Sequence, residues 1–194
     1  MEKFVRVTAV AAPLPLANVD TDMIIPARFM KALTREGLGR HLFQELRYAD
    51  DGSEREDFIL NRAACRGAGV LIADRNFACG SSREHAAWAL TDFGIRCVIA
   101  PSFGDIFAGN ARKNGLLLIR LPDAVCDRLR REMDLSQYAP IEVDLETQTI
   151  RLASGEAIAF EVDPDDRRVL LEGLDDIGRT LRHTGAIARF EDAG

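Results

Sequence analysis

Three short apolar runs, separated by helix-forming segments, constrain the fold of this chain more than any other feature of its sequence. The runs are Gly69–Ala73, Cys97–Ala100 and Leu116–Ile119, and each has the length and composition of a buried strand. An Ala- and Leu-rich segment that ends at Gly94 follows the first run, and a segment from Asp105 to Asn114-Gly115 follows the second. Strands and helices that alternate at this spacing predict βαβ units and a parallel sheet.

The sequence on both sides of these units predicts further elements of a single α/β domain that covers residues 1–194. Phe4–Val10 alternates as a strand does, and Pro13 and Pro15 end it. Beyond Pro140, three alternating segments separated by turn residues predict antiparallel hairpins at 141–145, 149–152 and 157–162. Helical patterns predict helices at 27–37, 38–48, 123–133 and 165–191, the last broken near Gly173 and Gly185.

Composition limits the partners and the compartment that we expect for this chain. The net charge is −6, from 25 basic and 31 acidic residues, and no Lys/Arg block exists, so nucleic acid is not an expected partner. The four cysteines are scattered and lack metal-binding spacing, which predicts no metal or cluster held by this chain and is typical of a reducing cytosol. Pro13 and Pro15 interrupt an N-terminus that faintly resembles a secretory signal, and no segment has the length to cross a membrane. We therefore expect a cytoplasmic protein without membrane contact.

The turn Asn76–His85 joins the first apolar run to its helix and carries reactive side chains. Ser81-x-x-Glu84 has the pattern of a capping box, with Ser81 as N-cap and Glu84 at the third helical position, so a helix is expected to start near Ser81. Capping does not explain Arg83, because a cation in the first turn faces the positive end of the helix dipole. An anion shared by Arg83 and the free helix amides does explain it, and this predicts a carboxylate or phosphate site within contact range of Ser81 and Ser82.

At this turn the sequence resembles the G-S-S-R-E-H signature of the swivelling domain of the aconitase superfamily. Three other segments agree with that family in the same order along the chain: Asn18–Pro26, Ala100–Phe107 and Gly173–Gly178. Over nearly its full length the chain is similar to the small subunits of bacterial 3-isopropylmalate dehydratases. One departure is Ala78, where relatives often carry Gly, and Ala mildly restricts the turn. The resemblance implies the swivelling β/β/α fold, with a mostly parallel core sheet and added antiparallel strands.

The resemblance also implies a reaction that two subunits share. Members of the family interconvert 2-isopropylmalate and 3-isopropylmalate, by dehydration and rehydration through 2-isopropylmaleate, in leucine biosynthesis. A large subunit carries a [4Fe-4S] cluster on three cysteines and forms a heterodimer or higher assembly with the small one. The small subunit binds no cluster of its own, and the substrate is a small dicarboxylic hydroxy acid.

Carried over residue by residue, the resemblance assigns roles to the side chains of the turn. Ser81 matches the serine that acts as an alkoxide base, and Arg83 matches the residue that binds a substrate carboxylate. Ser82 is expected to add a hydrogen bond, and Glu84 and His85 are expected to support these groups. Arg28 and Arg35 are the cations that could meet a second carboxylate, and we prefer Arg35 because it lies in a family-like Thr-Arg-x-Gly.

The residues alone leave other interpretations open. A serine hydrolase could use Ser81 with His85, although no nucleophile elbow is present and a histidine one turn along the helix points poorly at the hydroxyl. A phosphate or nucleotide binder could use the helix N-terminus, but Walker A and G-x-G-x-x-G motifs are absent. Related hydro-lyases that act on citraconate, homoaconitate or dimethylmalate share the pattern, and a structural or regulatory partner with a degenerate site is a further alternative. Asp20 and Asp22 could hold a divalent metal, for which an Asx-type turn is the simpler explanation.

Overall fold

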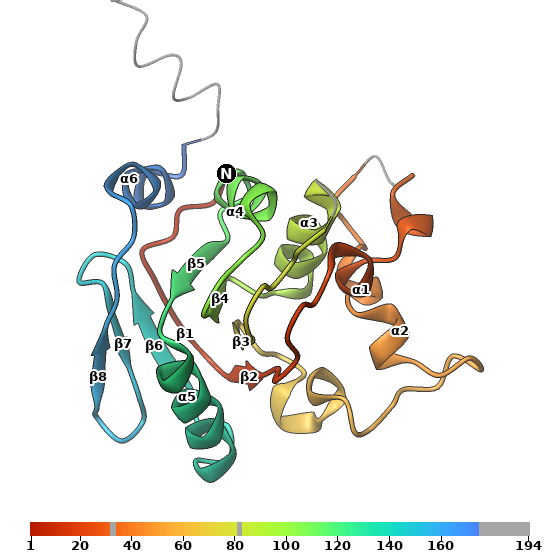
Figure 1. The fold of residues 1–194 in the computed structure, drawn as a ribbon, viewed down its shortest axis with the longest axis horizontal. Helices are drawn as coiled ribbons and strands as arrows, with labels where there is room; N and C mark the ends of the chain where they lie inside the picture. Colours follow the sequence, from red (N-terminus) through yellow and green to blue (C-terminus); the bar gives the residue numbers. More distant parts are fainter. Residues whose placement is uncertain (32–33, 81–82, 175–194) are drawn as a thin grey trace, which may run out of the picture.

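A parallel four-stranded sheet lies at the centre of the computed structural model, which describes residues 1–31, 34–80 and 83–174 (Figure 1). Its strands are β2 (Ala11–Pro13), β3 (Val70–Ile72), β4 (Cys97–Ala100) and β5 (Leu117–Arg120), paired in that order. The three predicted strands are thus confirmed as β3, β4 and β5. Strand β2 was not predicted, and within the described residues it pairs only with β3, an edge position that tolerates its proline.

A second sheet is antiparallel and has the strand order β1-β6-β7-β8. The hairpins predicted beyond Pro140 are confirmed, because β6 pairs with β7 and β7 with β8. Strand β1 is the N-terminal strand, and Val10 alone separates it from β2, so the chain passes directly from one sheet to the other. The bounds of the four strands are Arg6–Ala9 (β1), Ile141–Asp144 (β6), Thr149–Arg151 (β7) and Ala157–Ala159 (β8).

Four helices of nine residues or more are described: α3 (Glu84–Phe93), α4 (Asp105–Lys113), α5 (Asp123–Leu135) and α6 (Pro164–Glu172). Gly94 ends α3 and Gly173 ends α6, each in the left-handed conformation that a glycine adopts readily. Asp163 caps α6 by accepting hydrogen bonds from the amides of residues 165 and 166. The helix predicted after Gly173 lies outside the described residues.

The segment between β2 and β3 differs from the prediction of two longer helices at 27–37 and 38–48. Among its described residues the segment contains two four-residue helices and four 3₁₀ turns: α1 (Thr21–Ile24), α2 (Gln44–Arg47), Ala27–Phe29, Gly39–His41, Ile59–Asn61 and Ala63–Cys65. Phe43, fully buried, interrupts the second predicted helix with a φ of 52°. Gly39 lies so close to α3 that a Cβ there would be 2.5 Å from the backbone nitrogen of Phe93. Tertiary packing therefore overrides the helical pattern.

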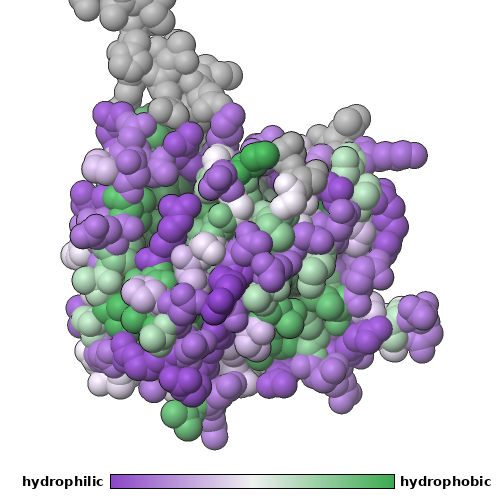
Figure 2. Space-filling view, viewed as in Figure 1, coloured by the Kyte–Doolittle hydropathy of each residue, from purple (hydrophilic) through white to green (hydrophobic). Residues whose placement is uncertain are grey.

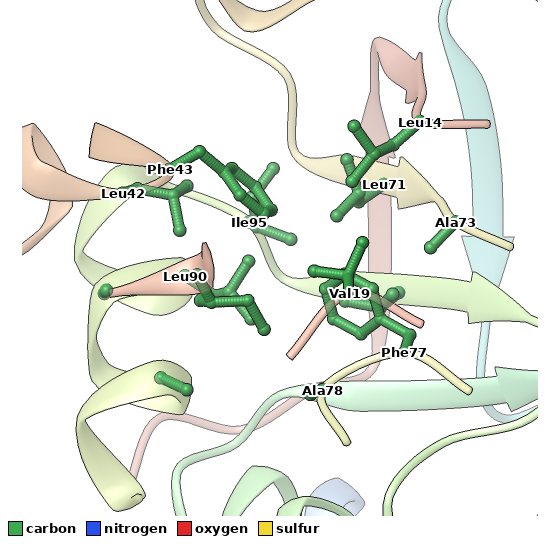
Figure 3. Packing of buried hydrophobic residues seen from close by; sticks show 14 of the residues in the cluster. Leu14, Val19, Leu42, Phe43, Leu71, Ala73, Phe77, Ala78, Leu90 and Ile95 are labelled. Carbon is green, nitrogen blue, oxygen red and sulfur yellow. The ribbon is translucent and has the colours of Figure 1, made fainter. Parts of the chain in front are cut away.

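Two hydrophobic clusters lie on opposite faces of the parallel sheet, as the alternation along its strands requires. Leu71 and Val98 belong to one cluster with α3 and α4, and Figure 3 shows Leu71, Val19, Phe77 and Ala78 among its packed side chains. Val70 and Ile99 belong to the other, which joins the sheet to α5 and the antiparallel sheet. The result is an α/β fold of layered sheets and helices, and the predicted fold class is confirmed.

On the face shown in Figure 2, hydrophilic residues surround smaller hydrophobic areas. Within the described ranges, no helix combines the length and the apolar character that a membrane span needs.

Candidate active site

The turn between β3 and α3 is held in an unusual backbone conformation. Asn76, Ala78 and Gly80 have φ values of 57°, 58° and 90°, in the left-handed region that non-glycine residues adopt at a cost of about 1–2 kcal/mol. Ala78 is also buried, with only 2% of its surface exposed. Such a conformation persists only where the surrounding structure imposes it, and two neighbouring segments do so here.

Those two segments are the residues before α1 and the residues before α4. On one side, the amide of Cys79 donates to the carbonyl of Val19 (3.2 Å), and the amide of Thr21 donates to the carbonyl of Cys79 (3.1 Å). On the other side, the amide of Phe77 donates to the carbonyl of Ser102 (3.0 Å). The amide of Gly104 donates in turn to the carbonyl of Phe77 (2.9 Å). Three sequence motifs that lie far apart in the chain therefore meet at this turn.

Helix α3 begins at Glu84 with Arg83 as its N-cap, so the predicted capping box is wrong. Glu84 is the first helical residue and not the third, and a carboxylate at that position does not reach back to the cap. Its Oε1 instead accepts hydrogen bonds from Nε1 of Trp88 (3.2 Å) and Nδ2 of Asn114 (3.0 Å). Glu84 thereby fastens the start of α3 to the end of α4. Ser81 and Ser82 lie outside the described residues.

Arg83 is a mostly buried cation, with 14% of its side chain exposed. Its Nη1 donates to Oδ1 of Asp22, and the two side chains form an ion pair. Its Nε is buried, and no described residue accepts a hydrogen bond from it. The hydrogen bond from Arg83 holds the pKa of the Asp22 carboxyl below its ordinary value, so Asp22 is ionised at neutral pH. The first turn of α3 thus contains a guanidinium with donors beyond those that Asp22 uses.

The two aspartates of the Asp20-Thr21-Asp22 motif have different roles. Oδ1 of Asp20 accepts from the amide of Met23 (2.7 Å) and caps α1, so the Asx-type interpretation is confirmed for Asp20. Asp22, which is 54% exposed, pairs with Arg83 and also accepts from the amide of Ala27 (3.2 Å). The pairing of Asp22 with Arg83 was not foreseen from the sequence, although Asp22 stands in a motif that the sequence analysis singled out.

Arg35 and His85 both lie against Trp88, on the same part of α3. The guanidinium carbon of Arg35 is 5.5 Å from the centre of the Trp88 ring, a cation–π distance, and Arg35 is exposed. The ring centroids of His85 and Trp88 are 4.7 Å apart. The structure therefore brings Arg35, Arg83, Glu84 and His85 together around the first turns of α3. Sequence reasoning did not identify Trp88, which contacts Arg35, Glu84 and His85.

Potential metal-binding side chains are scattered over the part of the chain that the structure describes. The described residues contain no set of three or more His, Cys, Asp or Glu side chains that could hold a metal ion. Burial raises the pKa of the Cys65 and Cys126 thiols to about 11 and also raises the pKa of Cys97. Raised pKa values keep these three thiols protonated at neutral pH, and none of them belongs to a group of side chains that could hold a metal ion.

A cavity of about 530 Å³ lies apart from this cluster of side chains. It is formed by residues 13–16, the Asp57–Ile59 region and one face of α5, and it includes none of Arg35, Arg83, Glu84 and His85. The candidate active site around the start of α3 is therefore separate from this cavity.

Comparison with known proteins identifies the class to which this fold and site belong. A family model described as the aconitase C-terminal domain matches residues 1–124, and a second model, described as LeuD_N, matches residues 127–164. The crystal structure of 3-isopropylmalate dehydratase (leuD) from Methanocaldococcus jannaschii superposes with a TM-score of 0.69 at 25% identity, covering 95% of this chain and 98% of that chain. The chain is thus an aconitase C-terminal-like domain, and its recognition from the turn motif is confirmed.

Closer relatives narrow the class to one family. The 3-isopropylmalate dehydratase small subunit of Gluconacetobacter diazotrophicus is 61% identical over 191 residues, which cover 98% of this chain and 92% of that protein. The corresponding subunit of Roseobacter denitrificans is 55% identical over 193 residues, covering 100% and 96%. This chain belongs to the family of 3-isopropylmalate dehydratase small subunits.

Proposed function

We propose that this chain is the small half of a hydro-lyase that interconverts 2-isopropylmalate and 3-isopropylmalate through 2-isopropylmaleate and is active only with its large subunit. In this proposal residues 1–194 act as one domain, in the cytoplasm, at the leucine-biosynthesis step for which its relatives are named. The observation that carries the proposal is Arg83, a mostly buried guanidinium at the start of α3 that directly follows the Ser81-Ser82 pair.

Moving a hydroxyl between neighbouring carbons needs three kinds of group. A Lewis acid must take the leaving hydroxyl, a base must take the adjacent proton, and cations must hold the two substrate carboxylates. When bound, a [4Fe-4S] cluster on the large subunit supplies the Lewis acid. The described residues of this chain contain no group of side chains that could hold a metal, and we assign the other two tasks to residues at the start of α3.

Ser81 is the proposed base. A serine hydroxyl is far too weak an acid to lose its proton at neutral pH unless its environment stabilises the alkoxide. Arg83, two residues further along the chain, supplies a positive charge, and the backbone amides at the start of α3 supply oriented dipoles. A buried guanidinium exerts a stronger field than one in water, which supports this assignment.

The proposed substrate contacts follow from charge and position. Arg83 binds one carboxylate, with Ser82 adding a hydrogen bond, and Arg35 binds the second carboxylate from its position over Trp88. Glu84 supports the site by joining α3 to Asn114, and His85 supports it by packing on Trp88. Arg35 is exposed in the isolated chain, as expected for a cation at a site that a partner subunit completes.

The proposal is tested by anaerobic turnover with and without the large subunit encoded in the same genome. The substrates are 2-isopropylmalate and citraconate, and the ultraviolet absorbance of the unsaturated acid reports the reaction. Activity only in the mixture, with preference for isopropylmalate, supports the proposal. Preference for citraconate would assign the chain to a related hydro-lyase. A cluster-loaded complex that turns over neither substrate overturns the substrate assignment.

Ser81→Ala tests the assignment of the base. The variant should assemble with the large subunit and lose turnover by at least about a hundredfold, the lower range for a general base. Ser154→Ala, in the exposed loop between β7 and β8, is a matched control that should keep full activity. Near-full turnover by assembled Ser81→Ala would show that another group is the base, and equal loss in both variants would point to a damaged preparation. If the wild-type complex binds the substrate but does not turn it over, a non-catalytic anion-binding subunit would be favoured.

A further inference from the structure

Asp22 lies where three parts of the candidate active site meet. Its Oδ1 atom accepts a hydrogen bond from Nη1 of Arg83, the N-cap of α3, across 61 residues of sequence. The same atom accepts from the amide of Ala27, the first residue of the turn that leads toward Arg35. Asp22 itself belongs to α1, whose preceding residues are joined to the Ala78–Gly80 region by backbone hydrogen bonds. One carboxylate oxygen therefore connects α1, the Ala27–Phe29 turn and α3.

Arg83 depends on this carboxylate for its orientation. A guanidinium with 14% of its side chain exposed has lost most of its hydration, so its donors need protein acceptors. Asp22 supplies the charged acceptor that the described residues offer to Arg83, while Nε remains buried without one. The side chain has several rotatable bonds, and an ion pair at one terminal nitrogen fixes the plane of the guanidinium and the direction of its other donors.

We propose that Asp22 is the positioning residue of the active site, holding Arg83 in the orientation that receives the substrate carboxylate. The inference rests on the proposed function, because it takes Arg83 as the carboxylate-binding group. Asp22 touches no reacting atom in this role and acts only through Arg83. Its second hydrogen bond, accepted from the amide of Ala27, holds the start of the Ala27–Phe29 turn beside the same carboxylate.

A different role for the same contact makes an opposite prediction. If Asp22 occupied the place of the substrate carboxylate, its removal would free Arg83 and tighten substrate binding. If Asp22 positions Arg83, its removal leaves the guanidinium free to rotate and weakens binding. The direction of the change in KM therefore separates the two roles.

Steady-state kinetics of the reconstituted complex test the proposal with Asp22→Ala and Asp22→Asn. Asp22→Ala should raise KM by about tenfold or more with a smaller fall in kcat, since loss of a charge-assisted bond to Arg83 is of that order. Asp22→Asn keeps an acceptor oxygen without the charge and should give an intermediate KM. Glu156→Ala is the matched control, because it removes the carboxylate of the Arg128–Glu156 ion pair in another part of the fold and should leave KM unchanged.

A double-mutant cycle decides whether Asp22 acts through Arg83. In an Arg83→Ala background the additional effect of Asp22→Ala on KM should shrink to less than about twofold, because the coupled partner is gone. An undiminished effect in that background, a lower KM in Asp22→Ala, or a lower melting temperature with unchanged KM would each overturn the proposal.

A measurement on the isolated chain keeps this proposal distinguishable from the proposed function. The buried Nε–H of Arg83 should give a slowly exchanging nitrogen–proton NMR signal in the wild type and in Glu156→Ala, and it should exchange at least tenfold faster in Asp22→Ala. Unchanged exchange would show that Asp22 does not hold the guanidinium. A wild-type complex that turns over no hydroxy acid would overturn the proposed function, while the NMR result would still decide the role of Asp22.

Discussion

Gly104→Ala is the substitution for which the structure gives the sharpest expectation. Gly104 precedes α4 with φ −63° and ψ 134°, a conformation open to every residue, so backbone strain plays no part. A Cβ there would lie 2.4 Å from the carbonyl oxygen of Ala78 and 3.2 Å from Cα of Cys79. Since contacts of a Cβ below 3.0 Å are essentially never found, the turn must move by about 0.6 Å or more.

The cost of that movement can be estimated. Ala78 is buried and already in the left-handed conformation, and the Gly104 amide is bonded to the adjacent Phe77 carbonyl, so the turn has little room to adapt. Overpacking of this kind costs about 1–3 kcal/mol. For a chain of this length each kcal/mol lowers the melting temperature by about 2–4 °C, so a fall of about 4–8 °C is expected at the middle of that range. Displacement of the same turn shifts Arg83 and should reduce turnover about a hundredfold.

Thermal unfolding followed by circular dichroism, together with turnover of the reconstituted complex, measures both effects. Gly109→Ala provides the control, because Gly109 lies in the same helix and a Cβ there would meet nothing within 4 Å. That variant should be more stable than the wild type by about 0.5–1 kcal/mol, the helical advantage of alanine, with full activity. A Gly104→Ala protein that melts with the wild type and turns over normally would refute the steric reasoning.

Three further expectations follow from individual contacts. Arg83→Lys should raise KM and lower kcat, together about 10–100-fold in kcat/KM, because lysine lacks the planar fork; wild-type kinetics would contradict bidentate carboxylate binding. Ala78→Gly should change the free energy of unfolding by less than about 1 kcal/mol, because relief of the left-handed conformation offsets the lost methyl group and the added entropy of the unfolded chain. A larger change, measured by denaturant titration, would contradict this expectation. The hydrogen bond from the amide of Thr147, with the ion pair to Arg6, lowers the pKa of Asp144, so its stabilisation is complete above the unfolded pKa near 4 and is lost as pH falls through the folded value. Asp144→Asn should therefore have a lower free energy of unfolding at pH 7 and lose less of it as the pH falls. A pH dependence equal to that of the wild type would show that Asp144 does not cause this loss of stability.

Sequence patterns predicted the elements whose signals are local. Strands β3, β4 and β5 are continuous apolar runs bounded by turn residues, and the hairpins beyond Pro140 alternate without interruption, so each was recognisable alone. Glycine also ended α3 and α6 as expected. The motif around Arg83 indicated a candidate site for the same reason, since its residues are adjacent in the chain, and its site assignments stay predictions.

The elements that the sequence did not predict depend on distant partners. Ala11–Pro13 has a composition unlike that of a strand and becomes one through its pairing with β3. The region from 27 to 48 has a helical pattern, but Gly39 packs on α3 and Phe43 is buried in the core. Neither contact can be recognised from the neighbouring sequence. The pairing of Asp22 with Arg83 likewise joins residues that no short pattern connects.

The turn after β3 also determines when the site can form as the chain folds. The amide nitrogen of the Asn76 side chain bonds to Asn18 across 58 residues, and the Asn76 backbone amide bonds to Ser102 across 26. Contacts of such long range carry the entropy of closing large loops and form late compared with helices and hairpins. During synthesis the turn has both of its supports only after residue 104 has left the ribosome, so Arg83 cannot take its final position before the first half of the chain has emerged.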